Sequence, residues 1–160
     1  MTQEWLSSIE SMLREKQHPI SALANTTAVL WEAVPDINWV GFYLMDQGKL
    51  TLGPFHGKAA CMEIQLGRGV CGAALEADST LIVPDVHVFP GHIACDAASR
   101  SEIVIPVHFM GKAVGVLDVD STRHDRFGGA ERDFLEAVVR CIEACVDFAK
   151  TAFDLICHQV

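Results

Sequence analysis

The spacing of apolar residues changes twice along the chain. Apolar residues recur at helical intervals over residues 3 to about 16 and, after Pro19, from Ile20 to Val34. The same interval returns from Ala130 to about Cys157. The pattern therefore predicts two helices at the amino end and one long amphipathic helix at the carboxyl end.

Between these helices the pattern is typical of β-hairpins. β-branched and aromatic residues run from Ile37 to Met45, and a turn at Asp46-Gln47-Gly48-Lys49 leads into a strand from Leu50 to Phe55. A second hairpin is expected from Ile103 to Asp120, with its turn at Gly111-Lys112. The remaining expected elements are short strands at 62–66 and 81–83, a glycine-bounded turn at 67–69 and a helical turn or two at 73–77.

This order of elements predicts an α+β fold, with terminal helices packed on one face of an antiparallel sheet. A chain of 160 residues without repeats or a linker fits one domain, and we expect residues 1–160 to form it. Hydrophobic residues make up 50% and charged residues 21% of the chain, which is typical of a globular protein.

The charge argues against polyanionic partners. The net charge is −9 and the basic residues are scattered, so nucleic acids and anionic membranes are not expected to bind. No apolar run reaches the roughly 20 residues of a membrane span. The first residues lack the basic and then apolar pattern of a signal peptide, and we expect a soluble, cytoplasmic protein.

The segment 83–102 attracts attention because it is both broken and apolar. Pro84, Pro90 and Gly91 exclude a regular helix or an inner strand, yet the segment contains too many apolar residues for a solvated linker. Such a loop is expected to fold back and line a site. Because it also carries two histidines, one cysteine and three carboxylates, we expect the chemistry there.

The six cysteines fall into two groups and form no CxxC pair. Cys141, Cys145 and Cys157 lie on the predicted last helix, where packing is expected, with a metal clamped by the first two, which share a helix face, as the alternative. The other three lie in glycine-rich sequence at positions 61, 71 and 95. Redox or nucleophilic chemistry is favoured for them, with simple packing and a zinc site that includes His87 and His92 as the alternatives.

Asp118 and Asp120 are two apart in a predicted strand, so their side chains share one face. Two carboxylates pointing together on an apolar strand would repel each other unless a cation lay between them. The pair therefore indicates either a pocket for a small ammonium group or a solvated strand end.

Five segments together resemble the free methionine-(R)-sulfoxide reductases, which are single-domain enzymes of the GAF fold. They are NWVGFY (38–43), GPFHGKAAC (53–61), GRGVCG (67–72), FPGHIACD (89–96) and GVLDVDS (115–121). The resemblance covers about residues 20 to 140. It implies a six-stranded antiparallel sheet with helices on one face and a small enclosed pocket on the other, and Arg68 departs from the lysine more often found at its position.

The resemblance also implies roles for individual residues. Cys95 matches the catalytic thiol and Cys61 the principal resolving thiol, with Cys71 as a second thiol for disulfide exchange. The remaining matches are carboxylates that bind substrate, Glu102, Asp118 and Asp120, and aromatic residues around the methylthio end of the substrate, Trp39 and Tyr43. The resemblance implies a homodimer and implies neither a cofactor nor a metal. For His87 and His92 we expect only hydrogen bonds that stabilise the loop.

The chemistry expected from these residues is reduction of free L-methionine-(R)-sulfoxide. A thiolate attacks the sulfoxide, leaving methionine and a cysteine sulfenic acid, and a second thiol then condenses to a disulfide that a dithiol such as thioredoxin reduces. A protonated Glu102 or Asp120 would serve as general acid. The alternatives are a GAF module that binds a small ligand or senses oxidants without turnover, and a zinc-stabilised structural module.

Overall fold

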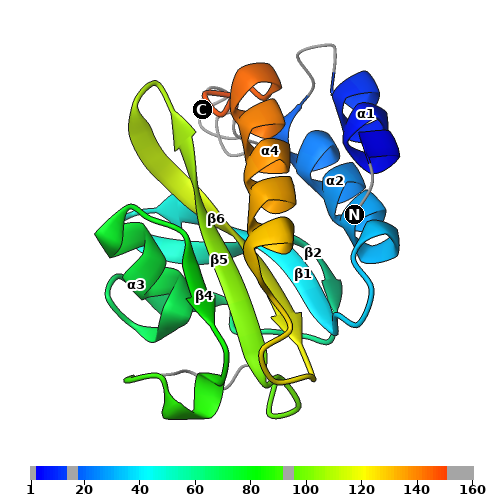
Figure 1. The fold of residues 1–160 in the computed structure, drawn as a ribbon. Helices are drawn as coiled ribbons and strands as arrows, with labels where there is room; N and C mark the ends of the chain where they lie inside the picture. Colours follow the sequence, from blue (N-terminus) through cyan, green and yellow to red (C-terminus); the bar gives the residue numbers. More distant parts are fainter. Residues whose placement is uncertain (1–2, 14–17, 92–95, 151–160) are drawn as a thin grey trace.

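The computed structural model describes residues 3–13, 18–91 and 96–150, which form a single sheet with helices on both faces (Figure 1). The sheet is antiparallel and has the strand order β3-β2-β1-β6-β5-β4. The strands are Trp39–Asp46 (β1), Lys49–Gly57 (β2), Glu63–Gln65 (β3), Leu81–Val83 (β4), Ser101–Phe109 (β5) and Lys112–Ser121 (β6). The helices are Gln3–Met12 (α1), Pro19–Ala33 (α2), Gly69–Ala77 (α3) and Gly129–Cys145 (α4), with a 3₁₀ turn at Val86–Val88 (η1).

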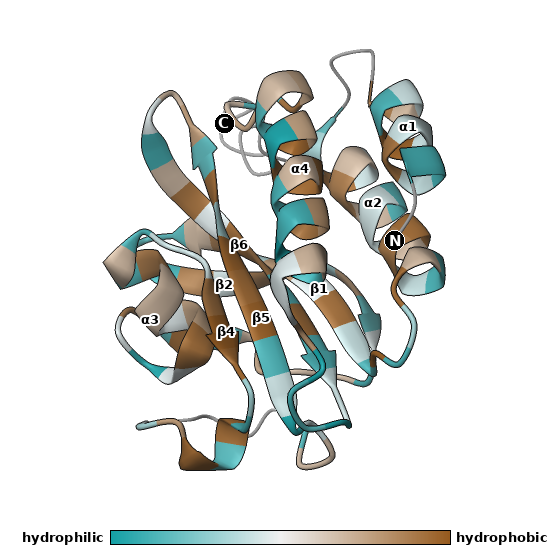
Figure 2. Ribbon diagram, in the orientation of Figure 1, coloured by the Kyte–Doolittle hydropathy of each residue, from teal (hydrophilic) through white to brown (hydrophobic). Residues whose placement is uncertain are grey.

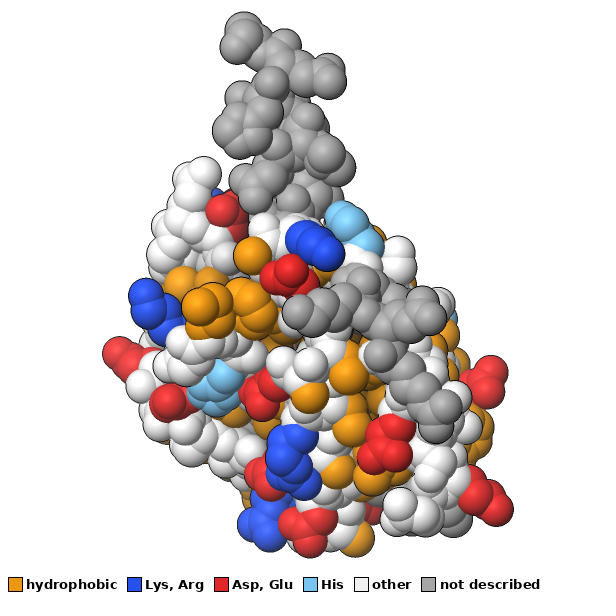
Figure 3. Space-filling view, turned by 90° about the horizontal axis from the view of Figure 1, so that it is seen from above, with side chains coloured by type: hydrophobic (Ala, Val, Ile, Leu, Met, Phe, Trp, Pro, Cys, Tyr) orange, Lys and Arg blue, Asp and Glu red, His pale blue; other side chains and the backbone are white. Residues whose placement is uncertain are grey.

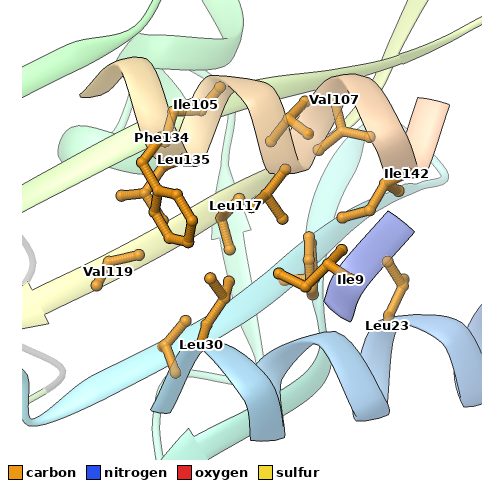
Figure 4. Close-up of a cluster of buried hydrophobic side chains, with 14 of the residues drawn as sticks. Ile9, Leu23, Leu30, Ile105, Val107, Leu117, Val119, Phe134, Leu135 and Ile142 are labelled. Carbon is orange, nitrogen blue, oxygen red and sulfur yellow. The ribbon is translucent and has the colours of Figure 1, made fainter. Parts of the chain in front are cut away.

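The terminal helices cover one face of the sheet, as the sequence predicts. Alternate residues of the central strands point toward α1, α2 and α4 and form the larger core. Figure 2 shows apolar residues, in brown, along these strands and helices. The close-up in Figure 4 draws part of this core: Ile9, Leu23, Leu30, Ile105, Val107, Leu117, Val119, Phe134, Leu135 and Ile142. The opposite face of the sheet carries a second, smaller core beneath α3.

The last helix is shorter than predicted. α4 ends at Cys145, Val146 is extended, and residues 151–160, including Cys157, lie outside the described residues. Val146 and Phe148 are buried in the larger core, and the Phe148 ring meets Phe109 edge to face at 5.9 Å. Burial of these two apolar side chains therefore favours an extended exit over another helical turn.

The hairpin turns need two successive residues with positive φ, which is the geometry of a type I′ turn. Gln47 and Gly48 supply it between β1 and β2, as predicted. Between β5 and β6 the turn residues are Met110 and Gly111, one position earlier than expected, because Lys112 already pairs with Phe109 in the sheet.

His108 ties α3 to α4. Its Nε2 lies 2.7 Å from a carboxyl oxygen of Asp78, which caps the end of α3, and its Nδ1 lies 3.0 Å from Glu143 of α4. Both carboxylates favour the imidazolium, with Asp78 contributing most, and raise the pKa of His108. This bridge fixes the position of α3 over its face of the sheet.

The surface shows mixed charge. On the face in Figure 3, acidic and basic side chains are interspersed among apolar and other residues. Of the helices in the part of the chain that the structure describes, none combines the length and apolarity that a membrane span requires.

Candidate active site

Three adjacent strands bring the predicted carboxylates and Trp39 together on the α3 face of the sheet. Asp118 and Asp120 share this face of β6, and the antiparallel register places Glu102 of β5 opposite Asp120. On the other side of β6, Trp39 of β1 pairs with Asp120. Strand alternation and register therefore create one cluster from three separate segments of sequence.

A cavity of about 40 Å³ lies between this face and the first turn of α3. It is lined by Trp39, Tyr43, Ala59, Ala60, Ile64, Gly69, Val70, Cys71, Asp96, Ser99, Glu102, Asp118 and Asp120. Because a water molecule needs about 10–15 Å³ of such volume, the cavity has room for a small polar group and its hydration.

The aromatic residues form a fixed wall of this cavity. The Trp39 ring stacks on Phe55 at 5.4 Å and on Tyr43 at 5.9 Å between ring centroids. Trp39 Nε1 donates a hydrogen bond to the Lys58 carbonyl at 3.1 Å, and the Tyr43 hydroxyl donates to the Cys61 carbonyl at 2.9 Å. The wall is thus held to the sheet and also holds the segment that carries Cys61.

Gly41 leaves the space in which the Trp39 ring lies. A Cβ atom at Gly41 would fall inside van der Waals contact of the Trp39 ring and 2.5 Å from Phe55 Cβ. We expect Gly41→Ala to displace the indole and cost roughly 1–3 kcal/mol of stability. Gly129→Ala is the control, because nothing lies within 4 Å of a Cβ there. Thermal melts measure both, and a Gly41→Ala variant as stable as Gly129→Ala would contradict this role for Gly41.

The floor of the cavity joins a thiol to two carboxyl groups. Cys71 Sγ donates toward Asp118 Oδ2 at 3.3 Å and lies 3.9 Å from Glu102 Oε1. Burial raises the pKa of Asp118 to about 7, and burial together with the charge of Asp118 raises the pKa of Glu102 well above its usual range. The same two causes raise the pKa of the Cys71 thiol. Near neutral pH the floor therefore holds protons.

One oxygen at this floor has no partner. Asp118 is only 6% exposed, and its Oδ1 is buried without a hydrogen-bond partner among the described residues. Asp120, beside it, also has a pKa raised well above its usual range, first by burial and then by the charge of Asp118. A buried carboxylate oxygen without a donor costs free energy, so this floor favours a ligand that brings a cation or a hydrogen-bond donor.

The rim contributes residues to which the sequence analysis assigned no role. Asn38 Nδ2 donates to Asp96 at 3.2 Å and to Ser99 Oγ at 3.0 Å. Asp96 differs from the carboxyls at the floor, because a hydrogen bond from the Ala98 N–H and the nearby Lys58 lower its pKa. Asp96 and Ser99 line the cavity. The Ala98 N–H, two residues on, donates to the Asp96 side chain and forms an Asx turn, a local motif for which aspartate in a loop is a sequence signal.

The cysteines separate into three situations. Cys61 is half-buried and disulfide-bonded, while Cys71, Cys141 and Cys145 are free thiols, so none of these three is its partner. Cys71 lies in α3 and not in the irregular sequence expected for it. Cys141 and Cys145 pack against the larger core, as predicted.

The structure brings together most of the predicted site. The side chains that line one cavity are those of Trp39, Tyr43, Cys71, Glu102, Asp118 and Asp120. Cys95 and His92 fall outside the described residues, so their places in the site, and the zinc alternative that includes them, remain predictions. His87 lies on η1, where its backbone N–H donates to Asp85, and is not among the described residues that line the cavity.

Comparison with known proteins finds close relatives. Residues 18–146 match the GAF domain family. The chain is 49% identical to the free methionine-R-sulfoxide reductase of Escherichia coli (strain K12), over 82% of this chain and 81% of that protein. Two solved structures superpose on it with a TM-score of 0.85. They are fRMsr of Staphylococcus aureus in its reduced form (46% identity, 88% and 91% coverage) and the free methionine-R-sulfoxide reductase of Neisseria meningitidis in complex with its substrate (43%, 89% and 86%).

Proposed function

This chain belongs to the free methionine-R-sulfoxide reductases of the GAF domain family, which makes it an oxidoreductase, and we propose that it reduces free L-methionine-(R)-sulfoxide to L-methionine through a thiol cycle. The observation that carries the proposal is the meeting of buried carboxyls and stacked aromatic rings around one small cavity. A module that binds a ligand without turnover finds less support, because named reductases are 40–49% identical over most of the chain.

The carboxyl cluster at one end of the cavity and the aromatic wall at the other would recognise different parts of the substrate. The unpartnered Asp118 Oδ1, with Glu102 and Asp120 beside it, would accept hydrogen bonds from the substrate ammonium. The apolar methylthio end would lie against Trp39 and Tyr43, whose rings are already fixed by hydrogen bonds. The first turn of α3 also lines the cavity, and because the Gly69 N–H already donates to the Gly91 carbonyl, the Val70 and Cys71 amides are the ones that would bind the substrate carboxylate.

The thiol cycle begins at Cys95. Its thiolate attacks the sulfoxide sulfur, and the sulfoxide oxygen takes up one proton. The hydroxyl group then passes from the substrate sulfur to the Cys95 sulfur as the transient sulfur–sulfur bond breaks, so methionine leaves and Cys95 becomes a sulfenic acid. The Cys61 thiol then attacks that sulfenic sulfur, forming the disulfide and releasing water. The disulfide-bonded state of Cys61 supports its role as the resolving thiol.

An external dithiol must restore the reduced enzyme, and thioredoxin is our proposed reductant. Two-electron exchange through a mixed disulfide returns both enzyme thiols and oxidises the partner dithiol. Because such dithiols are kept reduced in the cytosol, we propose the cytoplasm as the location. The homodimer stays a prediction from the family resemblance.

The protonated floor supplies the acid. Departure of the sulfoxide oxygen needs a proton, and Glu102 holds one near neutral pH because burial and the charge of Asp118 raise its pKa. A carboxyl kept neutral by its surroundings is a suitable general acid at this pH. We therefore propose Glu102 as the proton donor, with Asp118 as the anion that receives the ammonium.

Selectivity for the free amino acid tests this account. The N-acetyl derivative of methionine-(R)-sulfoxide presents an amide where the ammonium would lie, leaving buried carboxyls without a cation. We expect its kcat/KM to be about 10²–10⁴-fold lower than that of the free amino acid, since loss of a buried charged partner costs roughly 3–5 kcal/mol. Coupled assays with a dithiol measure both rates, the free (S) epimer serves as a stereochemical control, and equal rates on the free and acetylated substrates would overturn the proposal.

A further inference from the structure

The floor of the cavity has the donor set of a metal site. One ligand atom each from Cys71, Glu102 and Asp118 lies within 4.8 Å of the other two, and all three residues are buried. The three side chains come from α3, β5 and β6, which pack on one another in the smaller core. Their approach is therefore fixed by the fold and needs no ligand to assemble it.

A second observation points to a cation. Asp118 is 94% buried, yet its Oδ1 has no hydrogen-bond partner and Asp118 lines the cavity. None of the described residues that line this cavity is a lysine, arginine or histidine, whereas four of them are carboxylic acids. A concave site with only acidic ionisable groups and low-dielectric walls attracts cations.

We propose that Cys71, Glu102 and Asp118 bind one Zn²⁺ ion in the oxidised protein, in which Cys61 is disulfide-bonded. Zinc takes thiolate and carboxylate ligands together in a tetrahedral site, whereas Mg²⁺ and Ca²⁺ prefer oxygen alone. Three protein ligands leave one coordination position, and the cavity of about 40 Å³ has room for a water molecule there.

Binding at this site exchanges protons for the metal. Zinc binds thiolate and carboxylate groups in their deprotonated form, so the Cys71, Glu102 and Asp118 side chains release to solvent any protons that they carry, and no electron moves.

The site has a consequence for catalysis that rests on the proposed function. Asp118 Oδ1 cannot accept the substrate ammonium and ligate zinc at once, so the metal should compete with substrate. Oxidation removes Cys61 as a competing zinc ligand, and Cys71 remains a free thiol in the cavity. Zinc would thus bind where the reductase recognises its substrate.

The binding test uses the full chain, oxidised, with Zn²⁺ titrated against a chromogenic chelator. We expect one high-affinity ion per chain, with the affinity weakened more than about tenfold in Cys71→Ser and unchanged in the double control Cys141→Ser/Cys145→Ser. Co²⁺ bound to the wild-type protein should show a thiolate charge-transfer band, which does not depend on any variant folding. Unaltered zinc affinity in a folded Cys71→Ser variant, absence of that band, or equally tight Mg²⁺ binding would each overturn the site.

Kinetics separate this inference from the proposed function. We expect Zn²⁺ to raise the apparent KM for free methionine-(R)-sulfoxide without lowering kcat, and this competition to be lost in Cys71→Ser. Turnover that is insensitive to zinc overturns the competition and leaves the reductase intact. A protein that binds zinc through Cys71 but reduces no sulfoxide overturns the proposed function and leaves the metal site.

Discussion

A Cys95→Ser variant is expected to form no methionine from free methionine-(R)-sulfoxide, with kcat/KM lower than wild type by at least about 10³-fold. The serine hydroxyl cannot form the sulfur–oxygen intermediate on which the cycle depends, so neither dithiothreitol nor thioredoxin restores turnover. Quenched-flow measurement of methionine, at enzyme concentrations that reveal a single turnover, provides the assay.

Cys61→Ser separates attack from resolution. This variant should release one methionine per chain and then stall, or continue slowly by direct reduction, because the Cys95 sulfenic acid has lost its principal resolving thiol. A reagent specific for sulfenic acids should label Cys61→Ser after one turnover but label the wild type little. Full thioredoxin-dependent turnover in Cys61→Ser would transfer the resolving role to another thiol, with Cys71 the first candidate because it lies free in the same cavity.

Cys141→Ser is the matched control for both variants. Cys141 is a free, half-buried thiol that packs against the core on the opposite face of the sheet. It should keep wild-type kinetics, since its pKa is raised by burial and it has no path to the cavity. Loss of activity in this control, or methionine formation by Cys95→Ser, would contradict the assignment of the nucleophile.

The sheet and its carboxylates were predictable because a period of two places alternate residues on one face. Asp118 and Asp120 were recognisable because they interrupt an apolar strand at positions that share one face. The observed register adds Glu102 as their neighbour. The pairing of Trp39 with Asp120 could not be obtained in this way. Register depends on contacts between strands that are distant in sequence, and no local pattern encodes them.

The start of α3 could not be predicted from local propensity. Gly69 and Gly72 are poor helix formers, so the segment resembles a turn, yet α3 begins at Gly69. A Cβ at Gly72 would lie 2.5 Å from the Gln65 carbonyl oxygen, so glycine permits close packing of the helix on the preceding segment. Tertiary packing thus overrides propensity, and it places Cys71 at the floor of the cavity and not in a loop.

Asp118→Asn is expected to make the protein more stable and less active at the same time. The pKa of Asp118 is about 7 in the folded protein and 3.8 ordinarily, so the folded state binds the proton more tightly. The protonated Asp118 carboxyl therefore contributes stability that is fully present below about pH 4 and is lost as the pH rises through 7. At pH 8 the neutral amide removes a buried charge, and we expect a gain of about 2 kcal/mol, or roughly 4–8 °C in Tm.

The same substitution should lower kcat/KM for free methionine-(R)-sulfoxide by about 10²–10³-fold, because the buried anion proposed to receive the ammonium is lost. The gain in Tm should shrink at pH 5, where Asp118 is already protonated. Asp133→Asn is the matched control, since the Asp133 side chain is 71% exposed and its replacement should shift stability by less than about 0.5 kcal/mol. Thermal melts from pH 5 to 8 provide the measurement. A loss of stability at pH 8, or a gain independent of pH, would show that Asp118 is not a buried charge awaiting a cation.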